Sequence, residues 1–185
     1  NNHFAIKIIL ATLPALIVGF FVYEYLLQYL RSLVVIGWTS IIFAFILYFA
    51  DKVNTSKKNW EELNFFEMII IGFFQVLAFI PGASRAGVTI TGARIMKVRR
   101  DSAAIISMLL SIPIISASLG LAFFDILEEG RFLNDITQPI IAALVSFITA
   151  LLSIHMMMKI LKFTNFNIFI IYRIILGITL LVFYA

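Results

Sequence analysis

The chain has 185 residues, of which 62% are hydrophobic, 15% aromatic and 13% charged, and its formal net charge is +4. Soluble globular proteins have about 45–50% apolar residues, fewer than the 62% found here. This excess and the mean hydropathy of +1.06 exclude a soluble globular protein. The basic residues lie beside apolar segments, which argues against a nucleic-acid partner, and the lack of cysteine excludes disulfides and thiolate metal sites. The composition predicts an all-α integral membrane protein, with residues 1–185 forming a single polytopic membrane domain.

Segments long and apolar enough to cross a bilayer as helices recur along the chain, and we count five of them. They cover residues 4–29, 33–50, 102–125, 137–158 and 166–185. A polar loop over 51–64 comes after the second segment, and Trp60 stands where an interfacial aromatic anchor is expected. The sequence starts at Asn1 without an initiating Met and leads directly into an apolar segment, so we expect it to be truncated at its N-terminus.

Between these segments, residues 65–80 and 88–96 are apolar but too short to span comfortably, and Pro81-Gly82 joins them. This pattern predicts one re-entrant helical hairpin over about 65–96, in which non-helical backbone lines a cavity. The positive-inside rule supports it, because a hairpin that returns to its side of entry gathers most basic residues on one side and puts the C-terminus outside the cytoplasm. That side holds Lys7, Lys52, Lys57, Lys58, Arg94, Lys97, Arg99, Arg100, Lys159 and Lys162, against Arg31 and Arg131 on the other.

The tip of this hairpin is a loop suited to hold an anion. An arginine at membrane depth is costly unless it serves a cavity or a partner, and a guanidinium matches phosphate oxygens. Glycines let backbone approach a ligand, and a helix beginning near Val88 would point free N–H groups at it. The alternative is that the arginine satisfies carbonyls at a broken helix and the serine caps one. The candidate residues are Gly82, Ser84, Arg85, Gly87 and Thr89.

Two further polar positions are candidates for substrate contact. Gln75, in the first half of the hairpin, either reaches the cavity or bonds to a neighbouring helix. Arg173 either snorkels to the cytoplasmic interface, the interpretation that its place near the start of the last helix favours, or faces the cavity. No carboxylate or histidine lies near the loop in sequence to act as base or metal ligand, since Glu67 is at the hairpin entrance and Glu24 is in a distant helix.

Three motifs together resemble the undecaprenyl-diphosphate phosphatases of bacteria, also called bacitracin-resistance proteins. They are Gly72-Phe73-Phe74-Gln75-Val76-Leu77-Ala78, Pro81-Gly82-Ala83-Ser84-Arg85-Ala86-Gly87-Val88-Thr89-Ile90 and Ser107-Met108-Leu109-Leu110-Ser111-Ile112-Pro113. Leu13-Pro14-Ala15, Gly19 and Tyr172-Arg173 also occur at similar places in that family. The resemblance covers the whole chain.

The resemblance implies hydrolysis of undecaprenyl diphosphate to its monophosphate at the bacterial inner membrane, which recycles the lipid carrier for peptidoglycan synthesis. It implies an inverted-repeat fold, of which this chain would be the second half. Ser84 and Arg85 match the phosphate-binding pair and are the predicted catalytic residues, while Thr89, Gln75, Gly82, Gly87 and Arg173 are the predicted substrate contacts. The family uses a divalent cation, Mg or Ca, but no ligands for it are identifiable in this chain. Monomer and homodimer both stay open.

The sequence departs from the family pattern in two respects. The family's glutamate-rich motif, where the nucleophile and base are expected, does not occur in it. Ala86 replaces the usual serine after the arginine, and Ile105 and Ile106 replace a frequent glutamate and phenylalanine. Two alternatives to the phosphatase stand. Broken helices that point at a charge within the membrane are also used by secondary transporters, so one alternative is a transporter or channel for an anion or lipid. The missing motif leaves the other, a non-catalytic fragment that lacks the first active-site motif.

Overall fold

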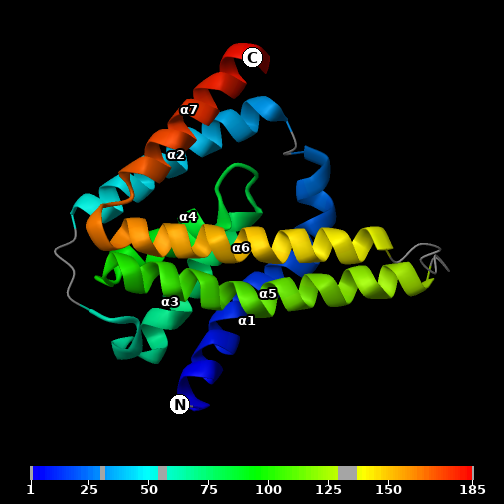
Figure 1. The fold of residues 1–185 in the computed structure, drawn as a ribbon, viewed down its shortest axis with the longest axis horizontal. Helices are drawn as coiled ribbons and strands as arrows, with labels where there is room; N and C mark the ends of the chain where they lie inside the picture. The colour runs from blue at the N-terminus through cyan, green and yellow to red at the C-terminus, as the bar shows by residue number, and fades with distance from the viewer. Residues whose placement is uncertain (1, 30–31, 54–57, 129–136, 185) are drawn as a thin grey trace.

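The computed structural model describes residues 2–29, 32–53, 58–128 and 137–184 (Figure 1). This part of the chain is helical and contains no strand. Five of its helices are long and apolar enough to cross a membrane, which confirms the predicted number. The elements are α1 (Asn2–Tyr29), α2 (Leu33–Lys52), η1 (Trp60–Glu62), α3 (Phe65–Val76), η2 (Leu77–Phe79), α4 (Arg85–Ile95), α5 (Arg100–Glu128), α6 (Thr137–Phe163) and α7 (Asn167–Tyr184).

The predicted hairpin is formed by α3, η2, a turn and α4. Its two ends meet, because the backbone N–H of Lys58 donates to Lys97 at 3.4 Å and that of Arg99 donates to the carbonyl of Lys58 at 2.9 Å. The chain therefore enters and leaves the hairpin at the same end of the molecule, as a re-entrant element requires. Its insertion into a bilayer stays a prediction. The second hairpin helix begins at Arg85, not near Val88 as expected, because Ser84 already caps it.

Small residues allow the hairpin to pack closely between the long helices. A Cβ on Gly72 of α3 would lie 1.9 Å from the carbonyl oxygen of Ala11 on α1, so the two backbones are in direct contact there. Gly37 of α2 and Gly177 of α7 meet in the same way, since a Cβ on Gly177 would lie 2.8 Å from the oxygen of Gly37. Close crossings of this kind are typical of membrane helices, which lack a hydrophobic driving force for association.

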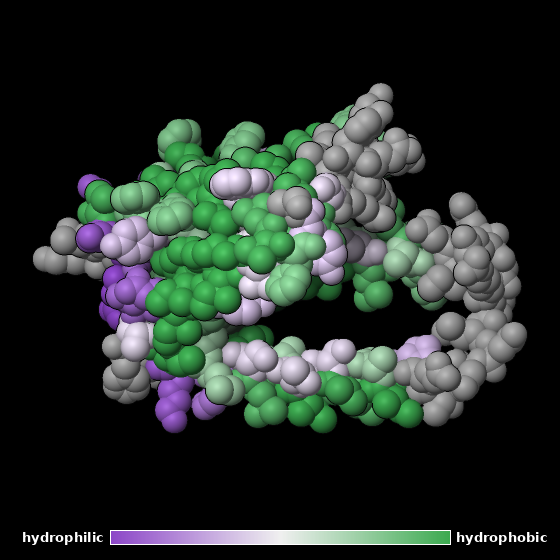
Figure 2. Space-filling view, turned by 90° about the horizontal axis from the view of Figure 1, so that it is seen from above, coloured by the Kyte–Doolittle hydropathy of each residue, from purple (hydrophilic) through white to green (hydrophobic). Residues whose placement is uncertain are grey.

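The surface of the described residues is mainly hydrophobic, and hydrophilic residues gather toward one end (Figure 2). Along the described part of α6, the side chains of Pro139–Met156 are all exposed, although the segment is strongly apolar. An apolar helix with such exposure is suited to face lipid or another membrane segment. Trp60, the expected interfacial anchor, is half-buried and packs edge-on against Phe4, with the ring centroids 4.6 Å apart.

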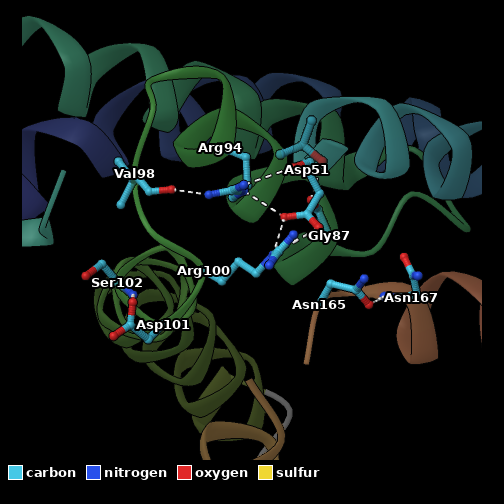
Figure 3. A network of polar contacts seen from close by, with 10 residues as sticks. Asp51, Gly87, Arg94, Val98, Arg100, Asp101, Ser102, Asn165 and Asn167 are labelled. Carbon is cyan, nitrogen blue, oxygen red and sulfur yellow. Dashed lines mark hydrogen bonds and ion pairs between the residues drawn. The ribbon is translucent and has the colours of Figure 1, made fainter. Parts of the chain in front are cut away.

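A buried ion-pair network joins three helices at the base of the hairpin (Figure 3). Asp51, at the end of α2, is 5% exposed, and its Oδ1 lies 2.8 Å from Nε of Arg94 and 2.9 Å from Nε of Arg100. Arg94 also donates to the carbonyls of Val98 at 2.6 Å and of Asp51 at 3.0 Å. Both arginines belong to the predicted cytoplasmic charge cluster, but Arg94 is fully buried and fixes the end of α4.

Removal of the Asp51 carboxylate is expected to destabilise the protein strongly. Asp51→Ala leaves the guanidinium of Arg94 buried without its counter-charge, which costs about 3–5 kcal/mol for a buried pair that loses one partner. Asp101→Ala is the matched control, because Asp101 pairs with the half-exposed Arg99 on the surface. Thermal unfolding in detergent measures both, and an equal small shift for the two variants would contradict this role of Asp51.

Candidate active site

The turn that joins η2 to α4 has an unusual backbone. Gly82 has φ +87°, and a Cβ there would lie 2.1 Å from Oγ1 of Thr39, so both conformation and space require glycine. Ser84 has φ +66° and ψ 114°, a region that residues with a side chain rarely adopt. Its Oγ accepts from the N–H of Gly87 at 3.3 Å, so Ser84 caps α4, as the alternative interpretation of the sequence expected, while its role toward phosphate stays a prediction. Strained backbone of this kind often marks a functional site.

Side chains from two other helices hold the carbonyls of this turn. Nη2 of Arg173 on α7 donates to the oxygens of Gly82 at 2.8 Å and of Ala83 at 2.9 Å. Thr39 on α2 donates to the carbonyl oxygen of Pro81. The hydroxyl of Ser40 lies 3.4 Å from the carbonyl oxygen of Gly82. The sequence alternative that an arginine satisfies carbonyls at a broken helix is therefore realised by Arg173, not by Arg85.

The interpretation that Arg173 snorkels to the interface is wrong. The residue is 8% exposed, and its second terminal nitrogen, Nη1, is buried without a hydrogen-bond partner among the described residues. A Cβ on Gly87 would lie 2.6 Å from this Nη1, so the absence of a side chain at Gly87 leaves room for the guanidinium beside the first turn of α4. A buried cationic nitrogen without a partner points to a ligand that supplies an acceptor.

A cavity of about 400 Å³ opens where α2, α4, α6 and α7 meet. Arg173, Ser84 and Gly87 lie in its wall with Gly82 and Ser40, so the positive end of the α4 dipole and a guanidinium meet there. No carboxylate is among the lining residues, and neither Arg85 nor Arg173 forms an ion pair with a described residue. The remainder of the wall is mostly apolar and includes Ile36, Leu47, Ile90, Met157, Phe166, Phe169 and Leu176.

The other three predicted site residues, Arg85, Gln75 and Thr89, are not among the residues that line this cavity. Arg85 is half-buried, and its Nη1 is buried with no partner among the described residues. Gln75 is 1% exposed, and neither of its amide atoms has such a partner, so the bond to a neighbouring helix, one of its two alternatives, is not found within the described chain. Thr89 is fully buried, where its hydroxyl bonds to the carbonyl of Arg85 at 2.9 Å and to Ser107 at 2.7 Å.

A divalent-cation site is not evident in the described residues, which contain no group of three His, Cys, Asp or Glu side chains that could hold one. The cations that line the turn would repel a metal ion unless a phosphate came with it. The donor set of the cavity therefore fits an anion and does not by itself fit Mg or Ca.

Thr39 and Ser40 are the turn-holding residues that the sequence did not reveal. In sequence both are ordinary hydroxyl residues inside an apolar helix, where such side chains usually bond back to the carbonyl four residues earlier. Asp51 gave a weak signal, because it is an acidic residue directly at the end of a membrane helix.

Fold and site together define an all-helical membrane protein with an arginine-held turn beside an apolar cavity. The family model for bacitracin resistance protein BacA matches residues 1–179. The chain belongs to this family, as its sequence resemblance predicted, and is a multi-pass bacterial membrane protein.

Curated relatives agree with this assignment. The chain is 38% identical over 179 residues to an undecaprenyl-diphosphatase of Jannaschia sp. (strain CCS1), covering 96% of this chain and 67% of that protein. It is 40% identical to the undecaprenyl-diphosphatase of Ruegeria sp. (strain TM1040), covering 96% and 66%, and 39% identical to undecaprenyl-diphosphatase 1 of Pseudoalteromonas translucida (strain TAC 125), covering 95% and 66%. The chain thus spans about two thirds of the length of these relatives.

A methyl group at position 87 is expected to weaken anion binding. In Gly87→Ala the new Cβ would meet Nη1 of Arg173 and displace the guanidinium from its present place, while Gly120→Ala, whose Cβ meets nothing within 4 Å, is the matched control. We expect affinity for inorganic pyrophosphate, measured by calorimetry in detergent, to fall about tenfold, or ~1.4 kcal/mol, in Gly87→Ala alone. Unchanged affinity would show that Arg173 does not face the anion.

Proposed function

We propose that the protein of this chain hydrolyses undecaprenyl diphosphate to undecaprenyl phosphate and inorganic phosphate, and so recycles the lipid carrier of peptidoglycan synthesis. Family membership and the names of the relatives support this reaction, and they do not favour a transporter or channel. The observation that carries it in the structure is the pairing of a cationic turn with an apolar cavity. A polyprenyl diphosphate has the same two parts, an anionic head and a hydrocarbon tail.

The head would lie at the start of α4. Arg173 and Ser84 both line the cavity there, Nη1 of Arg173 has no partner among the described residues, and the helix dipole adds to the attraction for phosphate oxygens. Arg85, on the same turn of helix, has a buried nitrogen that lacks a partner within the described chain. Its proposed role is to bind the diphosphate and to stabilise the charge that develops as the terminal phosphoryl group leaves.

The remaining predicted contacts take supporting roles in this proposal. The hydroxyl of Thr89 bonds to the carbonyl of Arg85 and so supports the first turn of α4. In this proposal Thr89 acts on the substrate indirectly, by holding Arg85. Gln75 lies buried with free donor and acceptor atoms within the described chain, which suits it to accept a polar group that substrate or a further segment supplies.

The reaction transfers the terminal phosphoryl group to water, and the bridging oxygen stays on the prenyl phosphate. In this proposal the residues of the cationic turn neutralise the charge of the diphosphate and orient it for the transfer. A divalent cation, expected from the family resemblance, would neutralise diphosphate charge when bound. The described residues do not by themselves fit such an ion. The nucleophile and general base are expected in the family's glutamate-rich motif.

Replacement of Arg85 is expected to abolish most of the activity. Phosphate release from undecaprenyl diphosphate in detergent should fall about 10²–10³-fold in Arg85→Ala, the usual loss when one transition-state donor is removed. Arg99→Ala is the control, because Arg99 is 51% exposed and pairs with Asp101 at the surface. Equal turnover in Arg85→Ala and the parent would refute the assignment.

Two forms of the protein should be assayed, this chain and any longer form encoded by the same reading frame. Turnover in this chain would show that a nucleophile or an activated water is held within residues 1–185. Turnover in the longer form alone would make the chain a fragment of the phosphatase. Substrate movement across vesicles without phosphate release would instead support the transporter alternative.

A further inference from the structure

We propose that Thr39 on α2 is a positioning residue, which acts with Arg173 on α7 to hold the active-site turn in its strained form. Thr39 belongs to no motif that resembles the family, and its hydroxyl lies within hydrogen-bonding distance of the carbonyl of Pro81. Its effect on catalysis rests on the proposed phosphatase function, whereas its effect on the turn does not.

Three consecutive carbonyls of the turn are bonded to side chains from outside the hairpin. Thr39 bonds to that of Pro81, and Arg173 bonds to those of Gly82 and Ala83. Within the described residues, no other donor reaches the oxygen of Pro81. Gly82 packs directly on α2, because a Cβ there would also lie 2.6 Å from the carbonyl oxygen of Ile36. The turn is therefore fixed against the pair of helices α2 and α7.

The turn needs such an anchor because its next residue is strained. Ser84, with φ +66°, is held in a conformation that is costly for any residue with a Cβ and persists only where the surroundings over-determine it. The side chains of Thr39 and Arg173 provide this constraint, because they hold the three carbonyls that precede Ser84. Release of Pro81 would free the turn to relax, and the cap hydroxyl of Ser84 and the start of α4 would move with it.

A simpler role for Thr39 predicts a different result. Its hydroxyl also lies 2.9 Å from the carbonyl of Val35, the back-bond that threonine commonly makes within a helix. A hydroxyl has one proton, so it donates fully to only one of these acceptors. If the back-bond dominates, loss of the hydroxyl has no effect on the turn.

The test compares Thr39→Val, which keeps the shape and removes the hydroxyl, with Thr39→Ser, which keeps the hydroxyl. Thr179→Val on α7 is the matched control, because its exposed hydroxyl bonds only back to Ile175 among the described residues. In the active form of the protein we expect kcat to fall about fivefold to tenfold in Thr39→Val, with KM little changed, as for the loss of one hydrogen bond that orients the site. Thr39→Ser should retain most of the parent's kcat, and Thr179→Val all of it.

A second readout is independent of activity. The chain has no cysteine, so a single Ala86→Cys at the exposed first turn of α4 accepts a nitroxide label selectively. We expect the mobility of this label, measured by electron paramagnetic resonance, to rise when Thr39→Val is added, and to stay unchanged with Thr39→Ser or Thr179→Val. A merely destabilising substitution would lower the unfolding temperature without a selective change at position 86.

The outcomes separate the two claims. Raised mobility in a protein that releases no phosphate in any form would overturn the proposed function and leave the positioning role of Thr39 standing. An active protein in which Thr39→Val changes neither kcat nor label mobility would overturn the positioning role and leave the phosphatase standing. Raised mobility with unchanged kcat would confine Thr39 to the structure of the turn and refute its part in catalysis.

Discussion

Backbone carbonyls that are not in a helix must find donors when they lie in an apolar interior, and the turn before α4 presents three of them in succession. The donors come from α2 and α7, which cross with the backbones of Gly37 and Gly177 in contact. This close crossing brings Arg173 near enough to reach the turn. The shape of the site thus depends on hydrogen bonds between the hairpin and a helix pair distant in sequence.

The arginines of α4 and α7 divide by their position along the hairpin. Arg94, at the base of the hairpin, is neutralised by Asp51 and serves the fold. Arg85 and Arg173, near the tip, have no carboxylate partner among the described residues, and each keeps a buried nitrogen without an acceptor there. A guanidinium so placed raises the energy of the empty site and lowers that of a site with a bound anion. The charge distribution alone therefore favours an anionic ligand at the tip.

Much of this could be predicted from sequence, since apolar lengths and the positive-inside count are properties of single segments. The hairpin could be predicted from these two properties, and the glycines and the serine cap from the residue types at its tip. The roles of Thr39 and Arg173 could not, because each depends on which carbonyls the fold brings within reach. Arg173 near a helix start looks like a snorkelling side chain until α2 and the turn surround it. The start of α4 at Arg85 also depends on the strained φ of Ser84, which cannot be predicted from a residue pattern.

The apolar wall of the cavity has an electrostatic consequence for the cationic turn. Phe166, Phe169 and Leu176 line the same cavity as the buried Arg173, so the attraction of its guanidinium for a phosphate oxygen is screened less than at a water-exposed surface. The same side chains offer contact area to a hydrocarbon chain attached to that phosphate. A free phosphate would gain the weakly screened attraction to Arg173 but not the apolar contact. It would also leave the apolar wall exposed to water. The arrangement therefore favours a lipid diphosphate over free phosphate, because adjoining parts of one cavity would receive its head and its tail.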